Sequence, residues 1–133
     1  MTMLNERLLA APGDVDDERA EQDVCGLDDL APDRGVCALV AGAPVAVFRC
    51  SPADELYAVG NVDPYSEASV LSRGIVGSIG DRAVVASPLY KNRFDLRTGE
   101  SLDDPSVRIP VHPVRIDGGR VLIGTAPVTP VPA

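Results

Sequence analysis

The chain contains no tryptophan, and aromatic residues make up only 4% of its 133 residues. A hydrophobic core must therefore be built mainly from valine, leucine, isoleucine and alanine, while 12 glycines and 12 prolines imply many turns. This composition suits short strands better than long helices. The length favours one domain and leaves no room for a second.

Positive charge and long apolar runs are also scarce. The formal net charge is −8, and residues 1–23 hold seven acids against Arg7 and Arg19. Since no basic stripe is present to displace counterions from phosphates, we expect no nucleic-acid partner. No apolar run approaches membrane-spanning length, and the first residues lack the charged-then-apolar pattern of a signal peptide. The expectation is a cytoplasmic protein that does not bind membranes.

The three cysteines, Cys25, Cys37 and Cys50, are an odd number at wide spacing, without a Cys-x-x-Cys pair or a nearby histidine. We expect each to fill a core position as a free thiol rather than to bind a metal. A reducing cytoplasm also disfavours a disulfide. The sole histidine, His112, lies in an apolar run between two prolines. A surface or edge-strand position is expected for it rather than a role as ligand or general base.

Three segments follow one another along the chain. Residues 1–22 are rich in acids without sustained periodicity, which predicts a mobile acidic arm, with a short helix over residues 3–10 as the alternative. Residues 23–124 consist of short β-branched runs and predict the folded domain. Residues 125–133 predict an extended tail, because their three prolines cannot donate to a sheet.

Nine runs bounded by turn residues predict strands within the domain. In the pair from Gly35 to Cys50, both strands are apolar on both faces, so we expect each to be buried on both sides in a sandwich of sheets. The spacing of strands and turns predicts an all-β, antiparallel domain. The nine runs are Asp23–Leu27, Gly35–Ala41, Pro44–Cys50, Glu55–Val59, Ile75–Ser78, Ala83–Ala86, Arg93–Leu96, Ile109–Ile116 and Arg120–Gly124.

Two segments carry a recognisable pattern: residues 61–65 read Asn-Val-Asp-Pro-Tyr, and residues 87–99 read Ser-Pro-Leu-Tyr-Lys-Asn-Arg-Phe-Asp-Leu-Arg-Thr-Gly. They resemble the metal-binding loops of a Rieske iron–sulfur domain. Such a domain holds a two-iron cluster with Cys-x-His on one loop and Cys-Pro-x-His on the other. The residues that survive from the Rieske pattern are Pro88, Phe94, Asp95, Thr98 and Gly99.

The four ligand positions of the pattern are changed. Asn61 and Asp63 stand in place of the first Cys and His, and Ser87 and Tyr90 stand in place of the second pair. None of these side chains supplies a soft thiolate, so we expect a degenerate site that binds no cluster.

The stretch from Val24 to Gly124 resembles the small subunit of assimilatory NAD(P)H-dependent nitrite reductase, a Rieske-like family that commonly lacks the cluster ligands. The resemblance implies a Rieske-like antiparallel β-sandwich with a loop-pair tip. It rests, besides the two loops, on Val45-Ala46-Val47-Phe48-Arg49, on Tyr57-Ala58-Val59, on Val70-Leu71-Ser72-Arg73-Gly74-Ile75-Val76-Gly77 and on Leu102-Asp103-Asp104-Pro105.

This family implies a subunit, not catalytic alone, that accompanies a large catalytic subunit. That partner would carry flavin, an iron–sulfur cluster and sirohaem, and would reduce nitrite to ammonium with electrons from a nicotinamide cofactor. No cofactor is expected in the present chain: Gly74–Gly80 is glycine-rich, but it reads as a hairpin and precedes no helix. Two alternatives stay open, an independent Rieske-type electron carrier with an altered metal site and a small-molecule binding module in the emptied cluster pocket.

The degenerate loops could hold a hard metal through Asp63 and Tyr90, with Asn61 and Ser87 as neutral ligands. One formal negative charge is a weak set for a divalent cation, so a hydrogen-bonded loop pair is the preferred interpretation. We expect the Tyr90 phenol to donate to Asp63 across the former histidine positions, with Leu89 and Tyr65 as apolar cover.

Basic residues gather in the sequence around the second loop. They form either a solvated face or a docking surface for an acidic patch on the large subunit, where charges of one sign steer association. The residues concerned are Arg73, Lys91, Arg93 and Arg97.

Overall fold

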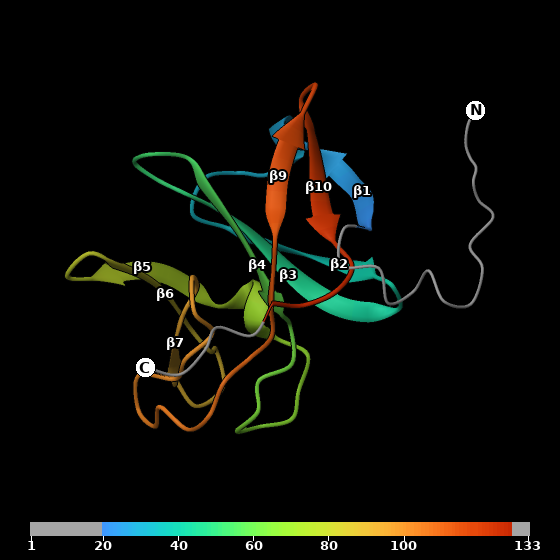
Figure 1. Cartoon of the computed structure of the whole chain (residues 1–133). Coiled ribbons are helices and arrows are strands. Elements are labelled where there is room, and N and C mark those ends of the chain that lie inside the picture. The colour runs from blue at the N-terminus through green and yellow to red at the C-terminus, as the bar shows by residue number, and fades with distance from the viewer. Residues whose placement is uncertain (1–19, 129–133) are drawn as a thin grey trace.

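The computed structural model describes residues 20–128, and within this range it contains ten strands and two short 3₁₀ helices. The strands are β1 Glu21–Gly26, β2 Gly35–Val40, β3 Ala43–Cys50, β4 Glu55–Gly60, β5 Ile75–Ile79, β6 Arg82–Ala86, β7 Arg93–Asp95, β8 Val111–His112, β9 Val114–Asp117 and β10 Arg120–Gly124; the 3₁₀ helices are η2 Leu27–Asp29 and η3 Leu71–Arg73. In Figure 1, β1, β9 and β10 lie above the central strands β2, β3 and β4, and the β5–β6 hairpin projects to the left.

The strands form three sheets with the orders β1-β10-β9, β2-β3-β4-β8 and β5-β6-β7. Every paired strand is antiparallel to its neighbour. The predicted all-β, antiparallel class is therefore confirmed. None of the helices in the described range is long and apolar enough to cross a lipid bilayer.

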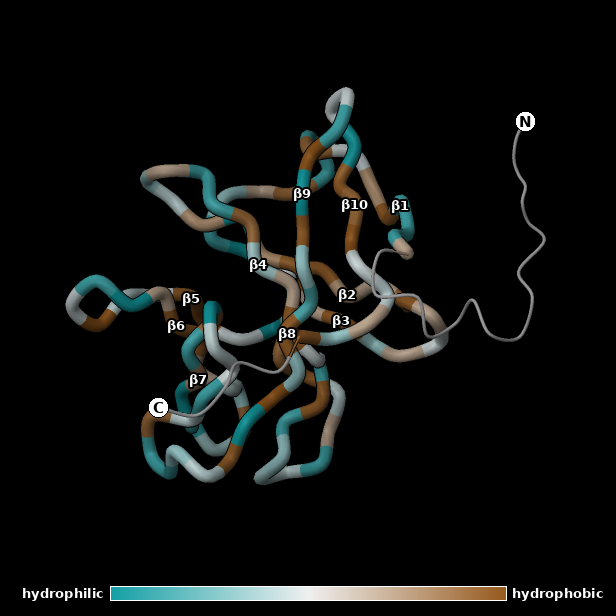
Figure 2. The backbone as a smooth tube through the Cα atoms, viewed as in Figure 1, coloured by the Kyte–Doolittle hydropathy of each residue, from teal (hydrophilic) through white to brown (hydrophobic). Residues whose placement is uncertain are grey.

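Strand β3 lies at the centre and contributes to two cores. Its side chains alternate between the sheet faces. Val45 and Val47 pack with β10 in one core, while Ala46 and Phe48 pack with β6 and β7 in the other. All four are fully buried, which confirms that this strand is covered on both sides. In Figure 2 the apolar colouring is strong where β3 and β4 cross the middle of the molecule.

The prediction for the first strand of that pair was wrong. β2 is an edge strand with only β3 beside it, and Val36, Cys37 and Leu39 are exposed, Leu39 by 66%. The outer sheets cover the middle of the central sheet and leave much of this edge open. The apolar sequence of β2 therefore does not lead to burial on both of its faces, because β2 lies at the edge of the sheet.

The nine predicted strands all occur, with ends shifted by up to two residues. The run Ile109–Ile116 was predicted as one strand, but it divides at Pro113 into the two strands β8 and β9. Proline has no N–H to donate to a ladder. β8 pairs with β4 in the central sheet, and β9 pairs with β10 in another sheet, so the chain changes sheets at this residue.

The ends of the described range are both tied to the domain. β1 begins at Glu21, two residues before the predicted strand, and the N–H of Thr125 donates to the Ala20 carbonyl over 2.9 Å. In the tail, the N–H of Val128 donates to the Val111 carbonyl. The expected mobile arm and extended tail otherwise fall on residues 1–19 and 129–133, outside the described residues.

Candidate functional site

The two loops that resemble Rieske cluster loops lie side by side at one end of the domain. The first loop (residues 61–70) follows β4 and leads into η3, and the second loop (residues 87–92) connects β6 to β7. Residues 61–70 leave the central sheet and residues 87–92 leave the sheet β5-β6-β7. The loops therefore meet where two sheets end, and we call them together the loop pair.

A hydrogen bond between Asp63 and Ser87 joins the two loops. The Ser87 hydroxyl donates to Asp63 Oδ2 over 2.6 Å, and the Tyr65 N–H donates to Asp63 Oδ1 over 2.9 Å. The residue Asp63 is 0% exposed and Ser87 is 1% exposed. Because the carboxylate is removed from water, each of these donors compensates part of its lost hydration. Two former ligand positions thus make a direct contact with each other.

Asn61 holds the first loop to η3. Its amide nitrogen donates to Ser69 Oγ over 2.7 Å, and its amide oxygen accepts the N–H of Ser72 over 2.6 Å. Its own N–H donates to the Pro44 carbonyl at the start of β3. Both the nitrogen and the oxygen of this buried amide are hydrogen-bonded within the protein, so Asn61 orders the loop.

The predicted bond between Tyr90 and Asp63 is wrong. Tyr90 is 67% exposed, and Ser87 rather than the phenol reaches Asp63. The second loop is a tight turn, closed by the bonds of Ser87 N–H to the Asn92 carbonyl and Lys91 N–H to the Ser87 carbonyl. Lys91 has φ of +65°, and this turn leaves the side chains at its tip in solvent. Leu89 is also exposed and does not cover the pair.

Tyr65, which was expected to cover the loop pair, is exposed, and its side chain is held by a partner that the sequence reasoning missed. Its phenol and the Ser101 hydroxyl are 2.8 Å apart, and its ring lies 6.0 Å from that of Phe94. Ser101 is buried and belongs to the segment after β7. No local motif marks this serine, because the contact depends on how residues 36 positions apart come together.

The surviving Phe-Asp and Thr-Gly residues have structural roles beside the loops. Phe94 is fully buried in the core. Asp95 Oδ1 accepts the N–H groups of Arg97 and Thr98, which closes the turn after β7. Gly99 has φ of +79°, and a Cβ there would collide with the Ile109 carbonyl oxygen. Their persistence is explained by packing without any metal.

The donors at the four former ligand positions do not fit a two-iron cluster. They offer an amide, a carboxylate, a hydroxyl and a phenol, whereas the cluster needs thiolate and imidazole. Nor do other residues replace them: the three cysteines lie on β1, β2 and β3, and His112 lies on β8 with Nδ1 2.9 Å from the Gly124 carbonyl. Within residues 20–128 no group of three potential His, Cys, Asp or Glu ligands is present.

The cysteines and the histidine partly follow expectation. All three cysteines are free, and Cys50 is buried as predicted, but Cys37 is exposed and Cys25 is half-buried. Of the two positions expected for His112, the edge strand is correct, because His112 lies on β8 at the edge of its sheet. The surface position is not, because His112 is buried.

The four basic residues expected to form one docking surface are distributed differently. Lys91 and Arg93 are exposed at the second loop and at the start of β7. Arg97 lies beside Tyr57 and Glu55, whose phenol and carboxylate raise the pKa of its guanidinium. Arg73 belongs to η3, where it lines a cavity with residues of β2 and β5.

The tip of the loop pair instead combines the two exposed cations with apolar side chains. Val62 and Tyr65 from the first loop, and Leu89 and Tyr90 from the second, are large hydrophobic residues in solvent. With Lys91 and Arg93 they constitute the tip surface. Large apolar side chains exposed on two hydrogen-bonded loops are the kind of feature that marks an interaction site.

Comparisons with known proteins identify relatives of the whole domain. Residues 22–124 match the model of the Rieske-like 2Fe–2S domain family. The nitrite reductase (NADH) small subunit of Salmonella typhimurium is 42% identical over 100 residues, 75% of this chain and 93% of that protein. A crystal structure from Mycobacterium tuberculosis, assigned as an NADH-dependent nitrite reductase small subunit, is 45% identical with a TM-score of 0.76, covering 84% of this chain and 97% of the other.

A third relative is a much longer chain. The nitrite reductase NAD(P)H large subunit of Klebsiella oxytoca is 39% identical over 106 residues, which are 80% of this chain and 11% of that protein. A domain similar to this chain therefore forms part of that large-subunit polypeptide.

Proposed function

Because the chain belongs to the Rieske-like 2Fe–2S domain family, and within it to the nitrite reductase small subunits, we propose that it is the small subunit of an NAD(P)H-dependent nitrite reductase. The observation that carries this proposal is the 42% identity to such a subunit over 93% of its length. The complex would reduce nitrite to ammonium on a large subunit that holds flavin, an iron–sulfur cluster and sirohaem.

The large-subunit relative supports the choice of partner. In the Klebsiella oxytoca protein the similar domain is joined covalently to the rest of a large subunit. A covalent link keeps a domain at high effective concentration beside its partner. We therefore propose that the present chain binds the corresponding large subunit as a separate polypeptide.

We propose that the chain contributes contact rather than electron transfer. A Rieske-type carrier needs two cysteines and two histidines at its loops, and the loop pair offers Asn61, Asp63, Ser87 and Tyr90. The side chains of Asp63 and Ser87 are already engaged with each other. The same geometry disfavours a small-molecule site, since Asp63 and Ser87 are buried and hydrogen-bonded to each other.

The tip surface is the proposed place of contact with the large subunit. Its exposed tyrosines and aliphatic side chains would be buried in the complex, where aromatic anchors contribute most of the binding free energy. Lys91 and Arg93 beside them would steer the approach of an acidic patch. We place the complex in the cytoplasm, a location supported by three cysteines that all remain free.

Two measurements test this proposal. Co-expression with the large subunit encoded in the same genome should give a complex on size-exclusion chromatography, and a Tyr90→Asp variant should weaken it. Leu39→Asp is a matched control, because Leu39 is equally exposed but lies on β2. Loss of the complex in both variants, or in neither, would contradict docking through the tip.

The second measurement concerns the cluster. Iron analysis of the purified chain should find none, and the reduced protein should show no Rieske electron paramagnetic resonance signal. Two iron atoms for each chain would instead establish the electron-carrier alternative.

A further inference from the structure

Strand β5 presents an unpaired edge. It lies at the end of the sheet β5-β6-β7 and pairs only with β6, through a two-residue turn at Gly80-Asp81. The residues flanking such a turn form a hydrogen-bonded pair, and hydrogen-bonded pairs alternate along the ladder. Ile75, Gly77 and Ile79 therefore direct their peptide groups at β6. Val76 and Ser78 direct theirs away from it, and no further backbone hydrogen bond within residues 20–128 involves them.

This edge has none of the usual protection against strand addition. Natural edge strands carry lysine, proline, a bulge or a covering segment. β5 reads Ile-Val-Gly-Ser-Ile and pairs with β6 without a register shift. Ile75 is 73% exposed. Figure 2 shows apolar colouring where β5 begins and again near the tip of the projecting hairpin, with paler segments between them.

Gly77 leaves additional room in the middle of the strand. A Cβ built on it would meet no atom within 4 Å, and its φ is not positive, so the packing of this chain does not require glycine there. A glycine inside a strand often marks a place where another backbone approaches closely. A side chain from an added strand would fit beside Gly77, between the exposed Ile75 and Ile79.

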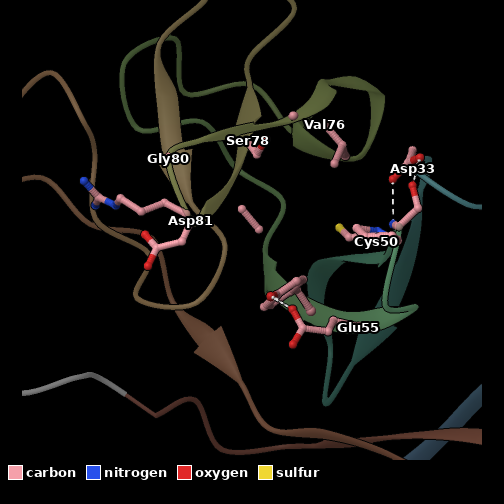
Figure 3. Close-up of a pocket in the computed structure, with 13 residues that line it drawn as sticks. Asp33, Cys50, Glu55, Val76, Ser78, Gly80 and Asp81 are labelled. Carbon is pink, nitrogen blue, oxygen red and sulfur yellow. Dashed lines mark hydrogen bonds between the residues drawn. The ribbon is translucent and has the colours of Figure 1, made fainter.

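A groove runs along this edge. Two cavities of about 440 Å³ each share Asp33 and Val76, so they adjoin along β5. The wall that faces β5 consists of residues 33–35 at the start of β2 and residues 50–52 at the end of β3, and the first cavity also extends to Tyr57 on β4 and to Arg82 and Ala83 on β6. Figure 3 shows Asp33 and Cys50 across the first cavity from Val76 and Ser78. An incoming backbone would thus lie between two walls, an arrangement suited to a single extended chain.

The two ends of the groove carry opposite charges. Near the β5–β6 turn it is lined by Glu55 and Asp81, and near the start of β5 by Arg34 and Arg73, while Asp33 lines both cavities and so lies between the two ends. Among the residues that the structure describes, Arg34, Arg73 and Asp81 form no salt bridge. Two cations lie near the acidic end: Arg82 is already paired with Asp95 and Glu100, and Arg97 lies beside Glu55. The negative charge at this end therefore comes mainly from Asp81.

We propose that the groove binds an extended segment of a partner protein as an added strand on β5. Val76 and Ser78 supply its backbone hydrogen bonds, and the charged ends set its direction. β5 runs from the basic end to the acidic end, and antiparallel pairing is the more stable kind. The segment therefore carries a basic residue at its N-terminal end, a small or β-branched middle, and an acidic residue at its C-terminal end. This is strand addition with charge-based specificity.

The test uses the full chain, labelled with ¹⁵N, and the peptide acetyl-Lys-Thr-Val-Thr-Val-Thr-Glu-amide at up to millimolar concentration. Binding should shift the amide resonances of Val76 and Ser78 and slow their hydrogen exchange. The peptide with its Lys and Glu exchanged should bind more weakly. Absence of shifts in β5 with the first peptide, or equal binding of both, would overturn the proposal.

Ser78→Pro removes the outward N–H without touching the ladder to β6. It should weaken peptide binding at least about tenfold, the loss of roughly one hydrogen bond. Ser78→Ala keeps the N–H and is the matched control, with unchanged affinity expected. Unchanged binding in Ser78→Pro would exclude strand addition.

A charge exchange keeps the proposal testable if Ser78→Pro does not fold. In the double variant Arg34→Glu/Arg73→Glu, the peptide ending in Glu should bind more weakly than it binds the unchanged chain. The same peptide with Lys in place of its final Glu should bind the double variant more tightly than it binds the unchanged chain. If the double variant keeps the original preference between the two peptides, the charge assignment is overturned.

Light scattering tests whether a second copy of this chain, rather than another protein, fills the groove. A mass twice the 13.9 kDa of one chain that is lost in Ser78→Pro would mean that a second copy fills the groove instead.

Discussion

Ser87 and Asp63, which stand at two positions where a Rieske domain has a cysteine and a histidine, are joined by a buried hydrogen bond of 2.6 Å. In a cluster-bearing domain the iron atoms tie the two loops together. Here the hydroxyl of the second loop and the carboxylate of the first make that connection directly. The charge of Asp63 makes the bond strong, and burial makes its loss costly.

This contact predicts coupled destabilisation. Ser87→Ala and Asp63→Ala should each lower the free energy of unfolding, and the double variant should cost less than their sum by about 1.5–3 kcal/mol. Urea unfolding of the four proteins measures this coupling. Strict additivity would mean that the two side chains do not stabilise each other.

The two tyrosines of the tip predict opposite results. Tyr65→Phe removes the contact of 2.8 Å with the Ser101 hydroxyl and should cost about 0.5–1.5 kcal/mol of stability. Tyr90→Phe removes an exposed hydroxyl without an internal partner in the described structure, so its effect should stay within about 0.5 kcal/mol. Thermal unfolding of both variants compares them. A large loss of stability in Tyr90→Phe would indicate that the Tyr90 phenol does form a hydrogen bond with the loop pair.

The cations of the tip surface predict an effect on the rate of association. Reversing the charge of Lys91 and Arg93 should slow binding to the large subunit at low ionic strength and weaken the salt dependence of the rate. Arg97→Glu should have a smaller effect, because Arg97 lies beside Tyr57 and Glu55. Stopped-flow mixing at several salt concentrations provides the measurement. Equal rates for all variants at low salt would remove the steering role.

Asp95 predicts a loss of stability in acid. Burial raises the pKa of its carboxyl, but the Arg82 guanidinium and the N–H groups of Thr98 and Arg97 outweigh burial and hold the pKa below the ordinary value of 3.8. A lowered pKa contributes stability that is fully present above pH 3.8 and is lost as the pH falls through the folded-state value. Arg82→Gln should therefore move the acid-unfolding midpoint to higher pH. A midpoint that does not move would show that Arg82 does not stabilise the ionised carboxyl.

The cysteines predict a graded reactivity. Burial, followed by the charges of Asp33 and Glu55, raises the pKa of the Cys50 thiol to about 11, so this thiol should react with a disulfide reagent at pH 8 only on unfolding. Cys37 is exposed and should react first. A Cys37→Ser variant should lose the fast phase. Fast modification of Cys50 in that variant would contradict its burial.

The sequence by itself determined the strands and the absence of cluster ligands. Alternating or continuous apolar runs fix where strands occur, because side chains must alternate between faces. The resemblance to the Rieske loops places Asn61, Asp63, Ser87 and Tyr90 at the ligand positions, and none of these residues carries a thiolate or an imidazole. Strand positions and residue types are local properties of the chain, so they can be predicted from the sequence alone.

Only the tertiary structure decided how the strands and loops are used. β2 and β3 are both apolar in sequence, but β2 lies at a sheet edge and β3 between two cores. Ser87 rather than Tyr90 reaches Asp63, because the turn closed at Asn92 leaves Tyr90 in solvent. Exposure and side-chain partners depend on contacts between residues far apart in sequence, and no local pattern records them.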